Sequence, residues 1–224
     1  MRPVLVLDGS DAGTGIGWAL VDAAGFIPEA GVLAGRDGAR LPAVLRDALR
    51  AARWRLDGEV LLAVVTGPGS FTGLRATIAL AHGLAAGSGA ALAGVTAGEA
   101  MLPVMRARHG AAACWWVSRA RRGRVFIEDG GAPDATARAA MLDALPAPAG
   151  GTVVLGGNVA TEVAAGLGTS DVRATVSELS TVQPGAVAVA ALRRMAAGIP
   201  VPAWPLYVDP PEAALPERRS AAAG

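Results

Sequence analysis

VLLAVVTGPGSFTGLR, residues 60–75, is the stretch of sequence that decides the fold. Its apolar half, Val60–Val65, predicts a buried strand, and the residues from Phe71 to about Ala86 predict a helix. Glycines and a proline between the two let the backbone turn sharply, and Ser70 is a favourable N-cap for the helix. A strand, a glycine turn and a helix in this order predict an α/β fold whose helix N-terminus receives an anion or a partner chain.

The turn itself is our candidate anion-binding loop. Its residues are Gly67, Pro68, Gly69, Ser70, Phe71, Thr72, Gly73 and Arg75. A tight structural turn explains the same residues, because the glycine spacing differs from the dinucleotide-binding fingerprint and the chain has no lysine for a Walker-type phosphate loop. The arginine at its end can meet a phosphate or a carboxylate across an interface, or form a salt bridge within the helix.

Hydrophobic periodicity predicts the elements on either side of this junction. In the first half we expect strands 4–7, 15–21, 27–34, 60–65 and 91–95, and helices 39–55 and 71–86. In the second half we expect a helix ending near residue 109, a hairpin over 114–128, a strand at 152–155, and helices 159–166 and 186–197.

Three antiparallel strands followed by helix, strand, helix and strand is the order of one half of an actin-like, ribonuclease-H-like fold. We therefore predict an α/β protein of two lobes, each a mixed sheet with helices. The predicted parts are an N-terminal lobe at 1–97, a degenerate C-terminal lobe at 98–205, and an extended or disordered tail at 206–224.

Two helices of the first half have more apolar surface than a small lobe needs. The helix at 39–55 has a stripe of apolar residues at helical spacing, and the helix at 71–86 is apolar or small on nearly all sides. Small residues let another helix approach closely, so we predict a four-helix seam with a partner chain, or a homodimer when the chain is alone. The predicted interface residues are Leu41, Val44, Leu45, Ala48, Leu49, Ala52, Leu74, Ile78 and His82.

The composition excludes several kinds of chemistry. The formal net charge of +1 argues against a broad electrostatic grip on nucleic acid, and the absence of lysine excludes Schiff-base catalysis. A single cysteine, Cys114, excludes an internal disulfide and a thiolate cluster, and its apolar surroundings favour a core residue over a nucleophile. Because His82 and His109 form no His-x-x-x-His pair, we expect no catalytic metal site.

Three further clusters have both a functional and a structural interpretation. Asp8 ends the first strand, where actin-like kinases keep a metal-linked carboxylate, but a turn cap is the favoured interpretation. The arginines of Arg119–Arg124 suit contact with a tRNA backbone, although we favour a solvated β-turn around Gly123. Gly156-Gly157-Asn158 resembles the second phosphate turn of actin-like ATPases, and here too a plain turn is favoured.

The chain has no good candidate for a membrane segment. Its first apolar run, residues 4–7, is too short for a signal-peptide core. The longest apolar window, residues 76–105, is interrupted by His82, Glu99 and Pro103, which fits helices and a strand better than a membrane span. We expect a cytoplasmic protein.

Three motifs, in their order and spacing, resemble the TsaB family, the non-catalytic subunits of the bacterial tRNA threonylcarbamoyladenosine machinery. The motifs are GPGSFTGLR at 67–75, RRGRVF at 121–126 and PLYVDPPEA at 205–213, so the resemblance spans nearly the whole chain. The chain departs from the family pattern at three positions, where it has Gly9, Arg119 and Asp209.

The resemblance implies a scaffold and activator subunit with no chemistry of its own. It implies that the chain pairs with the transferase subunit TsaD, that the ATPase TsaE joins them, and that the complex transfers a threonylcarbamoyl group to the adenosine 3′-adjacent to the anticodon of a tRNA. It also implies no cofactor of its own, with ATP or ADP at the interface with the partner complex. The alternatives are an ATP-dependent kinase or ATPase of the actin-like fold, and a metallopeptidase, whose ligands the chain lacks.

Overall fold

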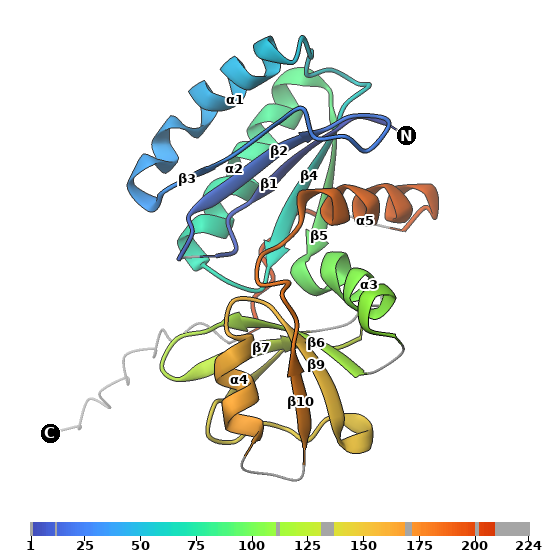
Figure 1. Cartoon of the computed structure of the whole chain (residues 1–224). Helices are drawn as coiled ribbons and strands as arrows, with labels where there is room; N and C mark the ends of the chain where they lie inside the picture. Colours follow the sequence, from blue (N-terminus) through green and yellow to red (C-terminus); the bar gives the residue numbers. More distant parts are fainter. Residues whose placement is uncertain are drawn as a thin grey trace, which may run out of the picture.

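The protein has two lobes, each built on a five-stranded sheet (Figure 1). The computed structural model describes residues 2–11, 13–110, 113–130, 137–168, 172–199 and 202–208. Within them the first sheet has the order β3-β2-β1-β4-β5, and the second has the equivalent order β8-β7-β6-β9-β10. In each sheet three strands are antiparallel neighbours and two more join in parallel. This repeated topology is that of the actin-like, ribonuclease-H-like fold, and the predicted fold class is confirmed.

The first lobe contains every element that the periodicity predicts there. Its strands are β1 (Val4–Asp8), β2 (Ile16–Val21), β3 (Glu29–Leu33), β4 (Leu61–Gly67) and β5 (Ala91–Thr96). Its helices are α1 (Leu41–Ala51), preceded by a 3-10 turn at Gly35–Arg40, and α2 (Phe71–Ser88). Helix α1 ends earlier than the predicted residue 55, because Arg53 has a positive φ of 56° that stops the helix.

The second lobe follows the linking helix α3 (Ala97–His109). Its elements are β6 (Ala113–Arg119), β7 (Arg124–Glu128), β8 (Arg138–Met141), a 3-10 turn (Ala149–Gly151), β9 (Thr152–Gly156), α4 (Ala160–Leu167), β10 (Arg173–Val176) and α5 (Pro184–Ala196). The sequence did not predict β8 and β10. Both are short strands at the edges of the sheet in which no residue is buried and half or more are exposed, so they lack the apolar alternation that marks a strand.

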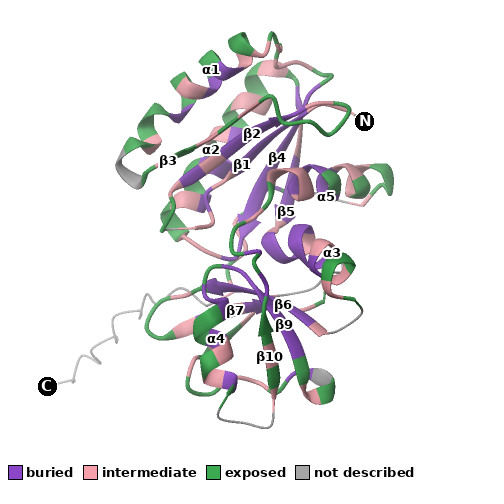
Figure 2. Ribbon diagram, viewed as in Figure 1, coloured by how far each residue is buried: buried purple, intermediate pink, exposed green. Residues whose placement is uncertain are grey.

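Helices cover both faces of the first sheet (Figures 1 and 2). Side chains alternate along β1, so Leu5 and Leu7 pack toward α1 and α2, whereas Val4 and Val6 pack toward α3 and α5. Strand β4 is buried along its whole length because it lies in the middle of the sheet and is covered on both sides, which explains its unbroken apolar sequence.

The last helix returns to the first lobe. Val187, Ala188 and Ala191 of α5 share one buried cluster with Val6 of the first sheet and with α3. The predicted C-terminal lobe, residues 98–205, includes α5, although this helix packs on the sheet of the first lobe. The domain limits stay a prediction. Of the predicted tail, residues 209–224 lie outside the described residues, and Leu206–Val208 have no helix or strand.

Candidate functional site

The signature loop packs directly against the turn that follows β1. A Cβ atom on Gly69 would lie 2.1 Å from the carbonyl oxygen of Ser10, and one on Gly73 would lie 2.2 Å from that of Gly9. The Ser70 backbone N–H donates to the Ser10 carbonyl at 2.7 Å. The glycines of the motif are thus required for a close contact between two segments of backbone.

The N-cap expected at Ser70 is present, since its hydroxyl accepts from the Gly73 backbone N–H at 3.3 Å. Close packing accounts for the glycines of this loop without a ligand. Anion binding by the loop stays a prediction.

Arg75 contacts residues of its own chain, and its expected contact with a phosphate or carboxylate across an interface stays a prediction. Its guanidinium lies 3.7 Å from the centre of the Phe71 ring and donates two hydrogen bonds, of 3.1 and 3.0 Å, to the Tyr207 hydroxyl. No acidic residue of the described chain forms a salt bridge with it. The local helix salt bridge considered from the sequence is therefore wrong, and the arginine instead joins the signature helix to the closing motif.

A C-terminal strap, residues 202–208, lies along α2. Ala203 is buried in the core beside α1 and α2, and the Leu206 backbone N–H donates to the Thr66 carbonyl at 2.8 Å. His82 contacts the Ala203 carbonyl at 2.9 Å and stacks on Trp204, with ring centres 5.3 Å apart. The sequence predicted only an extended tail here, although the closing motif was a signal that these residues have a fixed place.

The predicted partner interface is largely inside the molecule. Five of its side chains are at most 7% exposed and belong to the chain's own core: Leu41, Leu45, Ala48, Leu74 and Ile78. They cannot offer surface to another chain, because the stripe on α1 packs inward against the sheet and α2. Val44, Leu49 and Ala52 are half-buried, and His82 is exposed.

The surface that remains available is the outer face of α2. Apart from Phe71 and Arg75 near its start, its exposed residues are small or polar: Thr72, Ala76, Ala79, His82, Gly83, Ala86 and Gly87. Three exposed aromatic side chains lie at its border, and these are Phe71, Trp204 and Tyr207. On the neighbouring α1, Arg46 and Arg50 are exposed and Asp47 is the only exposed acid. We call the α2 face and these three aromatics the α2 surface.

A cleft of about 390 Å³ lies between the lobes. Two carboxylates, Asp8 and Asp11, line it, and no basic side chain does so among the lining residues that the structure describes. Burial raises the pKa of Asp8, although its carboxylate accepts the Ser10 backbone N–H at 2.8 Å. The cleft therefore has apolar, neutral polar and acidic walls.

The two turns that would hold phosphates in an actin-like ATPase are bonded to each other. The Asn158 side-chain amide donates to Asp11 at 3.1 Å and accepts the Arg119 backbone N–H at 3.0 Å. The Arg119 guanidinium in turn pairs with Glu162 on α4, with one contact at 3.1 Å. This chain of contacts bridges the two lobes.

The lobes are joined a second time at the start of α3. The buried Glu128 carboxylate, at the end of β7, accepts the Gly98 backbone N–H at 2.7 Å. Burial raises the pKa of Glu128 to about 7, against the lowering effect of hydrogen bonds from Thr96 and Gly98. The carboxylate lies at the positive end of the α3 dipole, where a negative charge is favourable.

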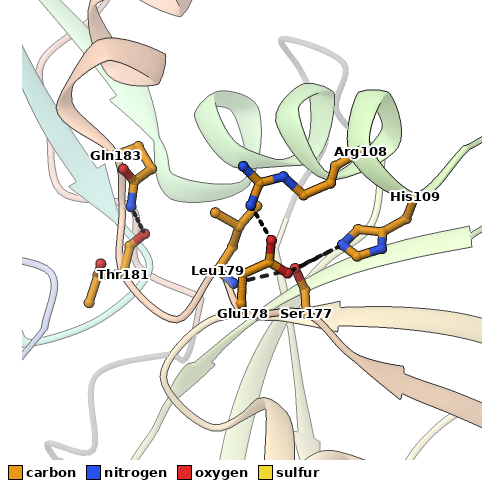
Figure 3. A network of polar contacts seen from close by, with 7 residues as sticks. All are labelled: Arg108, His109, Ser177, Glu178, Leu179, Thr181 and Gln183. Carbon is orange, nitrogen blue, oxygen red and sulfur yellow. Dashed lines mark hydrogen bonds and ion pairs between the residues drawn. The ribbon is translucent and has the colours of Figure 1, made fainter.

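The other end of α3 contacts the segment between β10 and α5 through a polar network (Figure 3). Arg108 pairs with Glu178, and His109 contacts the Ser177 hydroxyl at 3.0 Å. A hydrogen bond from its own backbone N–H lowers the pKa of Glu178 below its usual value, and the nearby charge of Arg108 lowers it further. A shallow groove between α3 and α5, lined by Pro103, Val104 and Val189, lies beside this network.

Among the described residues, no three His, Cys, Asp or Glu side chains come close enough to hold a metal ion. Cys114 is buried in the core, and burial raises the pKa of its thiol, which fits a structural cysteine.

Within the described chain, no helix combines the length and the apolar character that crossing a bilayer requires.

Comparison with known proteins places the chain in a family. The family model described as TsaD, tRNA N6-adenosine threonylcarbamoyltransferase, matches residues 21–149. Among proteins with curated functions, none matches the sequence significantly.

Two solved structures from Pseudomonas aeruginosa share the whole two-lobed fold. A protein described as uncharacterized, with similarity to peptidase YEAZ, has 21% identity and a TM-score of 0.73, covering 93% of this chain and 100% of its own. YeaZ has 22% identity and a TM-score of 0.68, covering 92% of this chain and 100% of its own. The family match spans more than half of the chain, including the signature loop and the β6–β7 hairpin. The protein therefore belongs to this tRNA N6-adenosine threonylcarbamoyltransferase family, and its motifs and fold agree with the TsaB (YeaZ) type.

Proposed function

We propose that the chain is a non-catalytic scaffold subunit of the tRNA threonylcarbamoyladenosine complex. In this proposal it pairs with the transferase subunit TsaD in the cytoplasm, the ATPase TsaE joins the pair, and the tRNA binds to the assembled complex. ATP or ADP would bind at the interface with the partner complex, and the isolated chain would form a homodimer.

The observation that carries the proposal is the α2 surface. Ala76, Ala79 and Gly83 are exposed near the middle of the helix, where they allow the backbone of another helix to approach closely. Phe71, Trp204 and Tyr207 add exposed aromatic area, the kind of side chain that most often anchors a protein interface. The proposed binding residues are therefore on the outward side of α2, whereas most of the interface residues predicted from the sequence are buried.

The cleft between the lobes supports a non-catalytic role. A kinase or ATPase needs cationic groups or a metal ion around the transferred phosphate. Here no basic side chain lines the cleft among the described residues, and Asn158 is bonded to Asp11 across the position where the two phosphate turns face each other. The actin-like kinase is therefore the weaker candidate.

The test is co-purification with the TsaD subunit after co-expression. Replacing Ala79 by Arg places a bulky charge in the middle of the α2 surface at little cost to helix stability, and we expect it to abolish co-purification. The matched control is Ala165→Arg, the same change at an exposed position of α4, which should bind normally. If the wild-type chain does not co-purify with TsaD, or if Ala79→Arg binds as tightly as Ala165→Arg, the proposal fails.

A further inference from the structure

Strand β3 is an open edge of the first sheet (Figures 1 and 2). It pairs with β2 on one side, and no strand of the described chain pairs with its other side. The opposite edge of the same sheet, β5, is approached by the C-terminal strap, because a Cβ atom on Gly94 would lie 2.2 Å from the Pro202 carbonyl oxygen. Within the described residues, β3 has no such cover.

The pairing of the sheet shows which backbone groups of β3 point outward. The Leu61 N–H donates to the Pro3 carbonyl, so the odd-numbered residues of β1 bond to β4 and the even-numbered ones bond to β2. Through the registers that follow, the odd-numbered residues of β3 bond to β2, and the N–H and C=O groups of Ala30 and Val32 point away from the sheet. These groups have no hydrogen-bond partner in the described chain. The side chains of both residues line the cleft between the lobes, roughly perpendicular to the free backbone groups.

The surface around this edge is apolar. Val32 is 62% exposed, and Phe26 in the turn between β2 and β3 is 68% exposed. Asp22 holds that turn, since its carboxylate accepts the Ala24 and Phe26 backbone N–H groups at 2.8 and 2.9 Å. Glu29 is the only charged side chain of the strand, and it is half-buried. An exposed apolar edge of this kind is a template for pairing with another chain.

The chemistry of the edge selects an extended strand as its ligand, because the free groups are backbone donors and acceptors in a row. A second copy of this chain supplies such a strand in β3 itself. In antiparallel register about a twofold axis at Gly31, Ala30 lies opposite Val32 of the second copy, so each outward N–H of these residues meets a carbonyl. Gly31 has no side chain to crowd the axis. Glu29 lies opposite Leu33 of the second copy, so the two carboxylates do not oppose each other.

We propose that two copies of the chain pair through β3 and form one continuous sheet across both first lobes. The inference rests on the proposed function only for the existence of a homodimer, and it assigns that homodimer to a different surface from the TsaD contact. Helix α2 packs over β1, β4 and β5, toward the other edge of the sheet, so the α2 surface stays available in the dimer. Because the paired strands are short, we expect a reversible, concentration-dependent dimer.

A proline at an outward position tests the backbone pairing. Val32→Pro removes an N–H that makes no hydrogen bond within the described chain, so the monomer should fold. The dimer loses one hydrogen bond per copy, and its dissociation constant should rise by roughly thirtyfold or more. Val32→Thr keeps the N–H and a β-branched side chain, and it should dimerise like the wild type. Sedimentation velocity over a range of protein concentrations measures the association, and circular dichroism checks the fold.

Cysteine cross-linking tests the register. The single native cysteine, Cys114, is buried and does not interfere. A mixture of Ala30→Cys and Val32→Cys chains should form a disulfide-linked dimer faster than either variant alone, because positions 30 and 32 lie directly opposite each other between copies. A mixture of Val32→Cys with Ala165→Cys, at an exposed position of α4, should not cross-link. If Val32→Pro does not fold, the cysteine mixtures decide the question alone.

Several results would overturn the inference. They are a wild-type chain that is monomeric at every concentration, a dimer that Val32→Pro leaves intact, and equal cross-linking in all the mixtures. Dissociation of the dimer by Ala79→Arg but not by Val32→Pro would place the homodimer on the α2 surface instead. If the wild-type chain dimerises through β3 but never binds TsaD, the proposed function fails and this inference stands.

Discussion

The carboxylate of Glu128 accepts the backbone N–H of Gly98 at 2.7 Å and so joins the second sheet to the first turn of α3. A Cβ atom on Gly98 would lie 2.5 Å from the Cβ of Glu128, so the helix can approach the carboxylate this closely only because residue 98 is glycine. The contact places an ionisable group in the core at the junction of the two lobes.

Stability should depend on pH through Glu128. Its pKa is about 7 in the folded protein against 4.5 for an ordinary glutamate, so the folded state binds its proton more tightly than the unfolded state. The free energy of unfolding should therefore be highest below pH 4.5 on account of this group, fall by up to about 3 kcal/mol between pH 4.5 and 7, and then level off. Urea unfolding at pH 5.5 and pH 8 measures the difference.

The control for this prediction is Glu128→Gln, which keeps an oxygen acceptor for Gly98 and removes the titration. Its stability should change less between the two pH values than that of the wild type. An identical pH dependence in both proteins would show that Glu128 ionises normally.

A charge at Leu45 should unfold the protein, in contrast to the surface role that the sequence predicted for it. Its side chain is 2% exposed, and Leu45→Asp would bury a carboxylate without a partner, at a cost of about 3 kcal/mol or more. Ala43→Asp, at an exposed position in the first turn of the same helix, should change stability by less than about 0.5 kcal/mol. Thermal unfolding followed by circular dichroism separates the two, and similar Tm values would contradict the placement of the stripe.

Two of the three glycines of α2, Gly73 and Gly83, should respond to alanine in opposite directions. In Gly73→Ala the new Cβ would lie 2.2 Å from the Gly9 carbonyl oxygen, so the signature loop must move, and we expect a loss of about 2 kcal/mol or more. In Gly83→Ala nothing lies within 4 Å, and the better helix propensity of alanine should add about 0.5–1 kcal/mol. Chemical denaturation of both variants gives the signs, and a stabilised Gly73→Ala would refute the close packing.

The C-terminal strap should be part of the folded first lobe. Ala203 is 4% exposed beside α2, and an aspartate there should destabilise the protein by about 3 kcal/mol and expose the strap to limited proteolysis. Tyr207→Phe removes only the exposed hydroxyl that accepts from Arg75, so it should cost at most about 1 kcal/mol. Normal stability and protease resistance in Ala203→Asp would mean that the strap is not anchored.

The elements that the sequence predicted best are those with a strong apolar pattern. The unbroken apolar run of β4 was enough to predict a strand, and the apolar stripe of α1 at helical spacing was enough to predict a helix. A strand buried on two faces and a helix buried on one face leave different apolar patterns in the sequence. Strands β8 and β10 were missed for the same reason, since edge strands with exposed side chains carry little apolar pattern.

The sequence alone determined the class of the fold, the signature junction and the family resemblance, because periodicity and motif spacing are properties of neighbouring residues. Only the tertiary structure decided which side of each helix faces outward, so that Leu45 is core and Ala79 is surface. It also brought Tyr207 to Arg75 and Glu128 to Gly98. Those contacts join residues far apart in the chain, and their partners are fixed by the packing of whole elements and not by any local pattern.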